Sequence, residues 1–277
     1  MTTWALAGAA YGLVLAFAAL TQPIRRRHVA LAAALAFTLA ALAAGTLADS
    51  LWINLLVPGG LLLAGYWLSG FFFLDPQPWL EAWLLRVDHA MRAERWMQWA
   101  PRPVAELLEL SYALDYAVIG GGALYAATFG TDAVARYWDL VLASELASFA
   151  PMPWLRSRPP RVIELEVADA GFRAKPGPPA KGRPSAEPPT ARSAAAMRRL
   201  NTVILERASV QANTLPSGHV SGAVAAALGV MAVDMVAGAW LMVMAALIAI
   251  AATAGRYHYI VDCIAGATVA LAFWLLL

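Results

Sequence analysis

The sequence predicts an all-α protein that crosses a membrane several times as a polytopic helical bundle. Of its 277 residues, 61% are hydrophobic and only 14% are charged, whereas ordinary globular chains carry roughly 25% charged residues. Several apolar runs approach the roughly 20 residues that a helix needs to span hydrocarbon. The single cysteine, Cys263, excludes an internal disulfide framework.

Eight membrane spans are expected, with boundaries good to a few residues. They lie at residues 3–22, 29–48, 51–73, 105–128, 137–152, 215–234, 238–255 and 258–277. The fifth is short and the last two nearly touch, so the count is good to one span. The first run is not read as a cleaved signal peptide, because its leader lacks positive charge and Arg25–Arg27 follow it.

Two segments between the spans are not expected to cross the membrane. Residues 75–103 combine tryptophan with arginine at a spacing that suits a helix lying in the membrane interface, and a solvated helical hairpin is the alternative. Residues 154–212 form a long basic loop. Its middle, residues 171–190, is rich in Pro, Gly, Ala and Lys and is expected to be flexible.

The basic residues are divided unequally between the two membrane faces. With eight spans, Arg25–Arg27, the 75–103 segment, the 154–212 loop and Arg256 share one face, and only Arg136 falls on the other. The positive-inside rule makes the basic face cytoplasmic. A phosphate site needs cations wherever it faces, however, so the charge pattern leaves the membrane side of such a site open.

The segment Pro216-Ser217-Gly218-His219 is expected to open the sixth span. Proline suits the first turn of a helix, because its missing N–H would have no partner there. Backbone N–H groups at the positive end of a helix form a ready anion site, and His219 beside it has the chemistry to protonate a leaving oxygen. The alternative is a helix cap followed by a histidine that reaches water.

A second motif, Arg256-Tyr257-His258-Tyr259-Ile260-Val261-Asp262, lies where the last two spans meet. A spacing of four puts His258 and Asp262 on one helix face, where the carboxylate fixes the imidazole tautomer and leaves the other nitrogen free to attack. The planar fork of Arg256 suits phosphoryl oxygens. An aromatic belt at the interface is the alternative, but a carboxylate inside a span is usually functional. A His–Asp pair four apart also occurs in metal sites, but with no cysteine or glutamate at hand no metal is expected.

Together the two motifs resemble the second and third signature motifs of the type 2 phosphatidic acid phosphatase superfamily. The third has the variant form of the inositol phosphorylceramide synthase-like branch. The resemblance implies a six-helix phosphatase-type core at 51–277, with residues 1–50 as two additional N-terminal transmembrane helices. It also implies that His258 is the nucleophile that forms a phosphohistidine, that Asp262 orients it, and that His219 protonates the leaving alcohol and activates the acceptor. Ser217 and Gly218 would cradle the phosphate, with no metal and no cofactor.

The sequence departs from the family pattern at two places. In the common third motif an arginine precedes the histidine by several residues, whereas Arg256 stands two before His258. The first motif has no clean match: Arg95 and Arg102-Pro103 fit its spacing, but the cluster after the fifth span fits its position. Arg158 and Arg161 are therefore expected as phosphate clamps, with Arg156 behind them. A basic patch that meets lipid headgroups is the alternative.

Polar residues also occur within the spans. Glu109, Tyr112, Asp115 and Tyr116 share one face of the fourth, and Glu145 lies in the fifth with Ser144 and Ser148. A buried carboxylate could relay protons or bind an acceptor hydroxyl. Interhelical hydrogen bonding is the alternative.

The expected function is hydrolysis of a lipid phosphate by an integral membrane enzyme through a phosphohistidine. One alternative is a lipid phosphotransferase that moves a phosphorylated headgroup, such as inositol phosphate, to a lipid alcohol. A second is a non-catalytic lipid-binding or transport protein. The expected partners are a lipid phosphate or phospholipid substrate and the bilayer, with no nucleic acid, and the expected location is the bacterial plasma (inner) membrane. The oligomeric state is left open.

Overall fold

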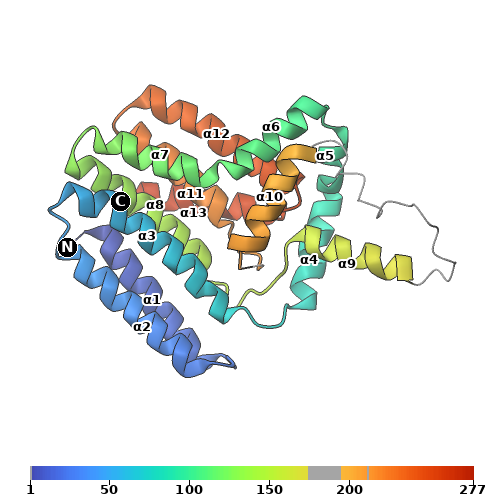
Figure 1. Ribbon diagram of the computed structural model, residues 1–277, viewed down its shortest axis with the longest axis horizontal. Coiled ribbons are helices and arrows are strands. Elements are labelled where there is room, and N and C mark those ends of the chain that lie inside the picture. Colours follow the sequence, from blue (N-terminus) through green and yellow to red (C-terminus); the bar gives the residue numbers. More distant parts are fainter. Residues whose placement is uncertain (1, 174–194, 211) are drawn as a thin grey trace.

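The computed structural model describes residues 2–173, 195–210 and 212–277. In these residues it is an all-helical protein, and Figure 1 shows its helices gathered into one bundle with further helices at one end. The predicted fold class is thereby confirmed. Most of the 171–190 segment, for which flexibility was expected, lies outside the described residues.

The eight apolar runs of the sequence appear as helices close to their expected positions. They are α1 (Thr3–Thr21), α2 (Arg27–Gly45), α3 (Leu51–Ser69), α6 with α7 (Arg102–Ala113 and Asp115–Ala127), α8 (Thr131–Phe149), α11 (Gly218–Met231), α12 (Met235–Ala254) and α13 (Ile260–Leu276). Four of the described helices are long and apolar enough to cross a membrane: α1, α2, α12, and α3 with the 3-10 turn Gly70–Phe72 that follows it. The protein is therefore an integral membrane protein.

The fourth run differs from its prediction, because it forms two helices instead of one. Leu114 takes φ −86° and ψ 0°, outside the helical region, and separates α6 from α7. The sequence carries neither proline nor glycine at this point. The break sets Tyr112 at the end of α6 and Asp115 at the start of α7 beside the same cavity.

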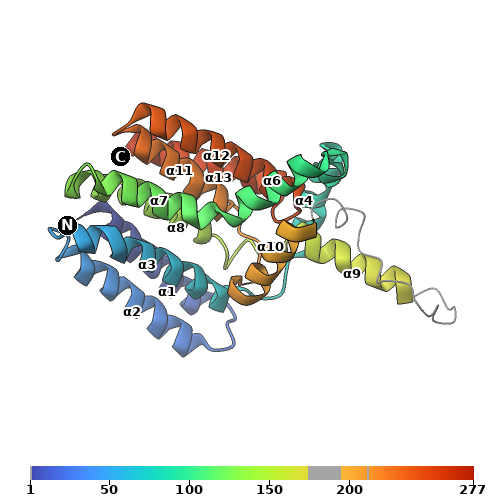
Figure 2. The same cartoon turned by 45° about the horizontal axis from the view of Figure 1, so that its top comes forward.

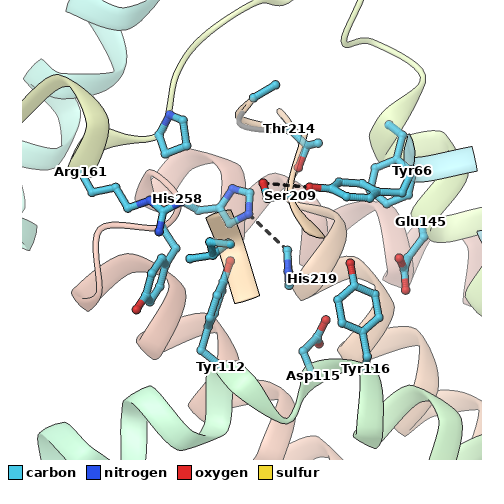
Figure 3. A pocket seen from close by; sticks show the side chains of 15 residues that line it. Tyr66, Tyr112, Asp115, Tyr116, Glu145, Arg161, Ser209, Thr214, His219 and His258 are labelled. Carbon is cyan, nitrogen blue, oxygen red and sulfur yellow. Dashed lines mark hydrogen bonds between the residues drawn. The ribbon is translucent and has the colours of Figure 1, made fainter. Parts of the chain in front are cut away.

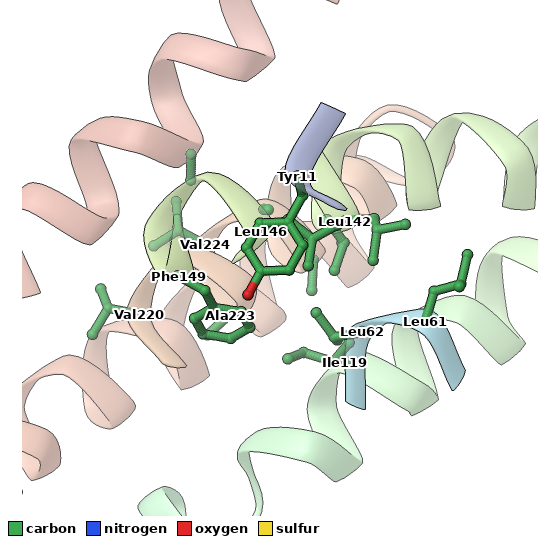
Figure 4. Close-up of a cluster of buried hydrophobic side chains, with 14 of the residues drawn as sticks. Tyr11, Leu61, Leu62, Ile119, Leu142, Leu146, Phe149, Val220, Ala223 and Val224 are labelled. Atoms are coloured by element: carbon green, nitrogen blue, oxygen red, sulfur yellow. The ribbon is translucent and has the colours of Figure 1, made fainter. Parts of the chain in front are cut away.

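One hydrophobic core joins the N-terminal hairpin to the rest of the bundle. Figure 4 shows Tyr11 of α1 beside Leu62 of α3, Leu146 of α8 and Val224 of α11. The hydroxyl of Tyr11 donates to the backbone oxygen of Gly65 at 2.9 Å. The first two helices therefore pack on the same core as the others. Their description as additions to a six-helix core stays a prediction about the family.

Helix α11 occupies the centre of this core. It packs against α7, α8, α12 and α13, and its inward positions are small: Ala223, Ala225 and Ala226 are fully buried. Small side chains let helix backbones approach closely in membranes, where tight packing drives association. The N-terminus of α11, which carries His219, is thereby fixed among its neighbours.

The remaining helices gather at one end of the bundle, as Figure 2 shows. They are α4 (Pro78–Ala90), α5 (Trp96–Trp99), α9 (Pro160–Arg173) and α10 (Ala195–Ala208). The long 154–212 loop thus contains a helix on each side of the part that is not described. In α4 the leucines Leu80 and Leu84 are buried, whereas Trp79 is 63% exposed. Such a pattern fits a helix in the membrane interface, which stays a prediction.

The expected charge division agrees with the order of the helices. The turn at Arg25–Arg27, the helices of the two long connections and the loop at Arg256 lie at one end, and both chain termini lie at the other (Figure 1). Arg136 stands in the early part of α8, on the side of the termini. Only the direction of this arrangement across the membrane stays open.

Candidate active site

The two motifs of the sequence meet at neighbouring helix ends. Ser217 caps α11, with its hydroxyl oxygen accepting from the N–H of Val220 at 3.4 Å. Helix α13 begins at Ile260 and is capped by Asp262, whose Oδ2 accepts from the N–H of Tyr259 at 3.0 Å. Pro216 lies two residues before the first helical residue and not in the first turn, so that detail of the prediction was wrong.

A direct backbone bond joins the two motifs. The N–H of Ser217 donates to the backbone oxygen of Asp262 at 2.9 Å. Gly266, one turn further along α13, makes this approach possible, because a Cβ there would lie 2.4 Å from the backbone oxygen of Ser217. Real Cβ atoms do not come so close to oxygen, so the missing side chain sets the distance between α11 and α13.

The two histidines face each other beside this contact between α11 and α13. His258 Nε2 lies 3.4 Å from His219 Nδ1, as the dashed line in Figure 3 shows. On its other side His258 presents Nδ1 to Asp262 Oδ2 at 3.5 Å. This distance is longer than a normal hydrogen bond. Asp262 thus stands behind His258, and His219 stands in front of it.

His258 is held in its neutral form. Burial is the larger cause and the nearby positive charge of Arg161 the second, and together they lower the pKa of His258 to about 3. A neutral imidazole has a free lone pair on the nitrogen that does not carry the proton. At neutral pH, Nε2 of His258 is therefore able to attack an electrophile without first losing a proton.

Tyrosine rings hold His219 from two sides. The ring of Tyr112 stacks on it with a centroid distance of 5.0 Å, and the ring of Tyr116 meets it edge-on at 5.8 Å. Tyr112 in turn stacks on Tyr257 at 4.0 Å. Through these two tyrosines, the face predicted for the fourth apolar run contacts both motifs: His219 of the first and Tyr257 of the second.

The predicted arginines occupy different surroundings. Arg161 lines the cavity beside both histidines, and its guanidinium lies 5.2 Å from the ring centre of Tyr257. Among the described residues no carboxylate pairs with it. Its backbone N–H donates to the oxygen of Arg256 at 3.1 Å, which ties α9 to the loop of His258. Within the described part of the chain, Arg161 is thus a charged fork that no carboxylate holds.

Arg158 is committed to ion pairs. Its guanidinium contacts Glu81 through Nε at 2.9 Å and through Nη2 at 3.0 Å, and Glu166 through Nη1 at 2.7 Å. It does not line the cavity. These pairs join the 156–160 segment to α4 and α9. Arg156, expected behind the clamp, uses its backbone N–H to reach Gln77.

Arg256 is likewise committed. Its Nη1 lies 2.6 Å from Asp88 Oδ2 and its Nη2 lies 2.8 Å from Glu164, and its side chain is 3% exposed. Arg256 also takes a left-handed backbone conformation with φ 63°, which is uncommon for a residue other than glycine. It shapes the loop of His258 and is absent from the cavity lining.

Ser217 and Gly218, expected to cradle phosphate, have backbone N–H groups that already donate within the protein. Ser217 donates to Asp262, as above, and Gly218 donates to Thr214 Oγ1 at 3.3 Å. A Cβ on Gly218 would lie 2.2 Å from the ring of Phe149, so its small size serves close packing. Thr214, one turn earlier, does line the cavity.

The sequence reasoning missed Asp88. Its Oδ1 accepts from the N–H of Ile260 at 3.0 Å while its Oδ2 pairs with Arg256. One buried carboxylate therefore holds both ends of the segment that carries His258. No local signal marks it, because Asp88 lies 168 residues from Arg256 in the sequence.

Two carboxyl groups in the spans also reach the cavity. Asp115 and Glu145 line it, and they are 1% and 2% exposed. Of the two serines of α8, Ser148 forms the interhelical hydrogen bond of the alternative, to Ser221 of α11 at 2.9 Å, whereas Ser144 donates to the backbone oxygen of Leu140 in its own helix. Among the described residues, no three potential ligands of the kinds His, Cys, Asp and Glu gather as a metal site.

The family model described as PAP2 superfamily matches residues 79–276, which is most of the chain and includes both motifs. The chain belongs to the PAP2 superfamily. No curated protein and no solved structure matches it. Members of the PAP2 superfamily are phosphatases or phosphotransferases, so a phosphatase-type activity on lipid phosphates is supported in general terms.

Proposed function

We propose that this PAP2 protein is an integral membrane lipid phosphatase that works through a phosphohistidine on His258. The observation that carries the proposal is the row Asp262, His258, His219. Asp262 Oδ2 is 3.5 Å behind Nδ1 of His258, and His219 Nδ1 is 3.4 Å in front of Nε2. An orienting carboxylate, a nucleophile and an acid thus lie next to one another in space, in that order, as covalent catalysis requires.

In the first step, Nε2 of His258 attacks the phosphorus of a lipid phosphate. The P–O bond to the lipid alcohol breaks as the P–N bond forms, and His219 gives its proton to the leaving oxygen. The proton on Nδ1 of His258 stays directed at Asp262, which stabilises the positive charge that develops on the ring. The products are a phosphohistidine and a neutral lipid alcohol.

In the second step, a water oxygen attacks the same phosphorus. His219, now neutral, takes a proton from the water, and the P–N bond breaks to release inorganic phosphate and neutral His258. The proton taken from water returns His219 to the protonated state in which the first step began. Each histidine therefore has one role per step, and neither is consumed.

We assign the phosphate contact to Arg161, because among the three candidate arginines it alone lines the cavity in the described structure. A guanidinium fork binds phosphoryl oxygens in pairs and offsets the charge that builds up during transfer. Arg158 and Arg256 act at a distance: their ion pairs with Glu81, Asp88 and Glu164 hold the surrounding segments in place.

The alternative is a phosphotransferase, in which a lipid alcohol replaces water in the second step. The carboxyl groups of Asp115 and Glu145 favour it, since they supply acceptors for an alcohol inside the same cavity. Membership of the inositol phosphorylceramide synthase-like branch, predicted from the third motif, belongs to this alternative.

The test is turnover by the purified protein in mixed micelles. Phosphatidate, an isoprenyl phosphate and a sphingoid phosphate are offered, and released phosphate and alcohol are measured with and without added diacylglycerol or ceramide. We expect turnover that His258→Gln abolishes and that Asp132→Asn, an exposed change at the far end of the bundle, leaves intact. Turnover by folded His258→Gln at the wild-type rate would contradict the mechanism. A folded wild type without turnover of any lipid would favour a binding or transport protein.

A further inference from the structure

The cavity has two chemically different sides. Figure 3 shows Arg161 on one side of the two histidines, and Asp115, Tyr116 and Glu145 on the other. The first side is cationic and holds the proposed phosphate contact. The second combines two carboxyl groups with aromatic rings, and neither step of the hydrolysis described above uses it.

On this second side, one oxygen of each carboxyl group has no partner among the described residues. Asp115 Oδ1 and Glu145 Oε1 are buried and accept no hydrogen bond from the described residues, and neither group is in an ion pair there. A buried polar atom without a partner costs on the order of 1–3 kcal/mol. Two such atoms at one cavity wall are therefore a feature that a ligand with donors would satisfy.

The packing around Glu145 makes room for its carboxyl group. Gly222 of α11 faces it, and a Cβ at that position would lie 2.0 Å from Glu145 Oε1. The helix interface thus keeps an acidic group where an alanine would exclude it. A structural bond between helices does not account for this arrangement, because Oε1 finds no donor on α11.

Electrostatics favour a phosphate on the first side, because Arg161 attracts an anionic phosphoryl group, whereas the second side offers no cation among the described lining residues. His219 and the side chains of Tyr66 and Tyr112 line the same cavity. His219 is also the residue proposed to exchange a proton with the alcohol oxygen, so the rest of that alcohol extends toward the two carboxyl groups.

We propose that Asp115 and Glu145 form a subsite for the alcohol of the reaction, and that this alcohol bears hydroxyl or primary ammonium donors. The inference rests on the proposed function, since it takes the alcohol oxygen to lie at His219. The carboxyl oxygens accept hydrogen bonds from those donors, and the rings of Tyr116, Tyr66 and Phe149 contact its carbon atoms. The preferred substrates are thus lipid phosphates whose own alcohol carries hydroxyl or primary ammonium donors, and the preferred acceptors are alcohols that carry such donors.

Binding requires movement of the lining side chains. The cavity has a volume of about 30 Å³, which is enough for one or two water molecules. The alcohol therefore displaces lining side chains as it enters. Its hydrogen bonds to the two carboxyl groups help to offset the free energy that this movement costs.

The test measures binding separately from turnover, as ligand-induced shifts in the melting temperature of the full-length protein in detergent. The probes are inorganic phosphate, glycerol phosphate, phosphoethanolamine and phosphocholine, whose quaternary ammonium has no N–H donor. Glycerol and ethanolamine, each added with inorganic phosphate, distinguish a free acceptor from an alcohol bonded to the phosphate. The variants are Asp115→Leu and Glu145→Leu, which remove the acceptors, and Asp115→Asn and Glu145→Gln, which keep the shape. Asp132→Asn is the control.

We expect the wild type to bind glycerol phosphate and phosphoethanolamine at least about tenfold more tightly than phosphocholine or inorganic phosphate. The leucine variants should lose this preference and still bind inorganic phosphate. Equal binding of all probes, no binding of any probe, or an unchanged preference in all four folded variants would overturn the subsite. Preference without turnover or phosphohistidine would overturn the proposed function alone, since the subsite would then serve binding.

Discussion

The N–H of Ser217 donates to the backbone oxygen of Asp262 at 2.9 Å, and this backbone bond joins the two motifs of the site. Each motif alone is only a short segment at a helix end. Joined in this way, they set His219 and His258 at 3.4 Å from each other. The chemistry proposed here depends on that junction, and the variants below test its parts.

Gly266→Ala should separate the two motifs. The added Cβ would stand 2.4 Å from the backbone oxygen of Ser217, so α11 and α13 must move apart. Overpacking of this kind costs about 1–3 kcal/mol. We expect a large loss of turnover alongside this modest loss in the free energy of unfolding. Gly121→Ala is the matched control, because nothing lies within 4 Å of its Cβ. Equal turnover by the two variants would show that the junction does not set the histidine geometry.

Asp88 should act as a positioning residue for His258. Asp88→Asn keeps an acceptor for the N–H of Ile260 but loses the ion pair with Arg256, whereas Asp88→Ala loses both. Bonds to charged groups contribute roughly 1.5–3 kcal/mol, so we expect kcat to fall about tenfold in the first variant and about a hundredfold in the second. KM should change little, because Asp88 does not line the cavity.

The control for Asp88 is Glu166→Gln, which breaks a more exposed ion pair with Arg158. It should leave kcat and KM nearly unchanged, because exposed pairs contribute little. A rise in KM at constant kcat for Asp88→Asn would instead place Asp88 in substrate binding.

Arg161 and Arg158 should respond differently to the same substitution. Arg161→Gln removes the proposed phosphate contact, and a lost charge-stabilising donor lowers kcat by roughly 10²–10³. Arg158→Gln breaks the partly buried pair with Glu81 and should lower the free energy of unfolding by about 1–3 kcal/mol. Steady-state kinetics and thermal unfolding of both variants show which arginine contacts the phosphate and which stabilises the fold. A larger kinetic defect in stable Arg158→Gln would return the clamp to Arg158.

The buried neutral state of His258 should make the protein less stable in acid. The pKa of His258 is about 3 when folded and near its usual 6.5 when unfolded. Between these values the unfolded chain binds the extra proton, so stability falls as the pH drops below about 6.5. The contribution is at most about 1.4 kcal/mol per pH unit. Unfolding of wild type and His258→Gln from pH 7 to pH 5 should show a shallower decline for the variant. Parallel curves would mean that His258 is not held neutral.

The sequence predicted the positions of the apolar helices well, because an apolar run is a local signal, and four of the described helices are long and apolar enough to cross a membrane. A run of apolar residues marks a membrane helix wherever its neighbours lie, and a spacing of four sets His258 beside Asp262 without knowledge of the fold. The break at Leu114 had no such signal, since the sequence has no proline or glycine there. Tertiary packing, and not local propensity, determines it.

The roles of the arginines depend on distant partners and were therefore less accessible to sequence reasoning. Arg256 meets Asp88 across 168 residues, and Arg158 meets Glu81 across 77. A basic cluster predicts that some arginine binds phosphate, but only the fold separates Arg161, which faces the cavity, from the arginines that acidic partners hold elsewhere.

The most direct test of the central claim is mass spectrometry of the protein quenched during turnover, without acid, on a lipid phosphate. The account predicts a phosphoryl group on the peptide that contains His258, at a level that decays when substrate is exhausted and that is absent from His258→Gln. Steady turnover with no phosphoryl group on His258, or with the group on another residue, would contradict it.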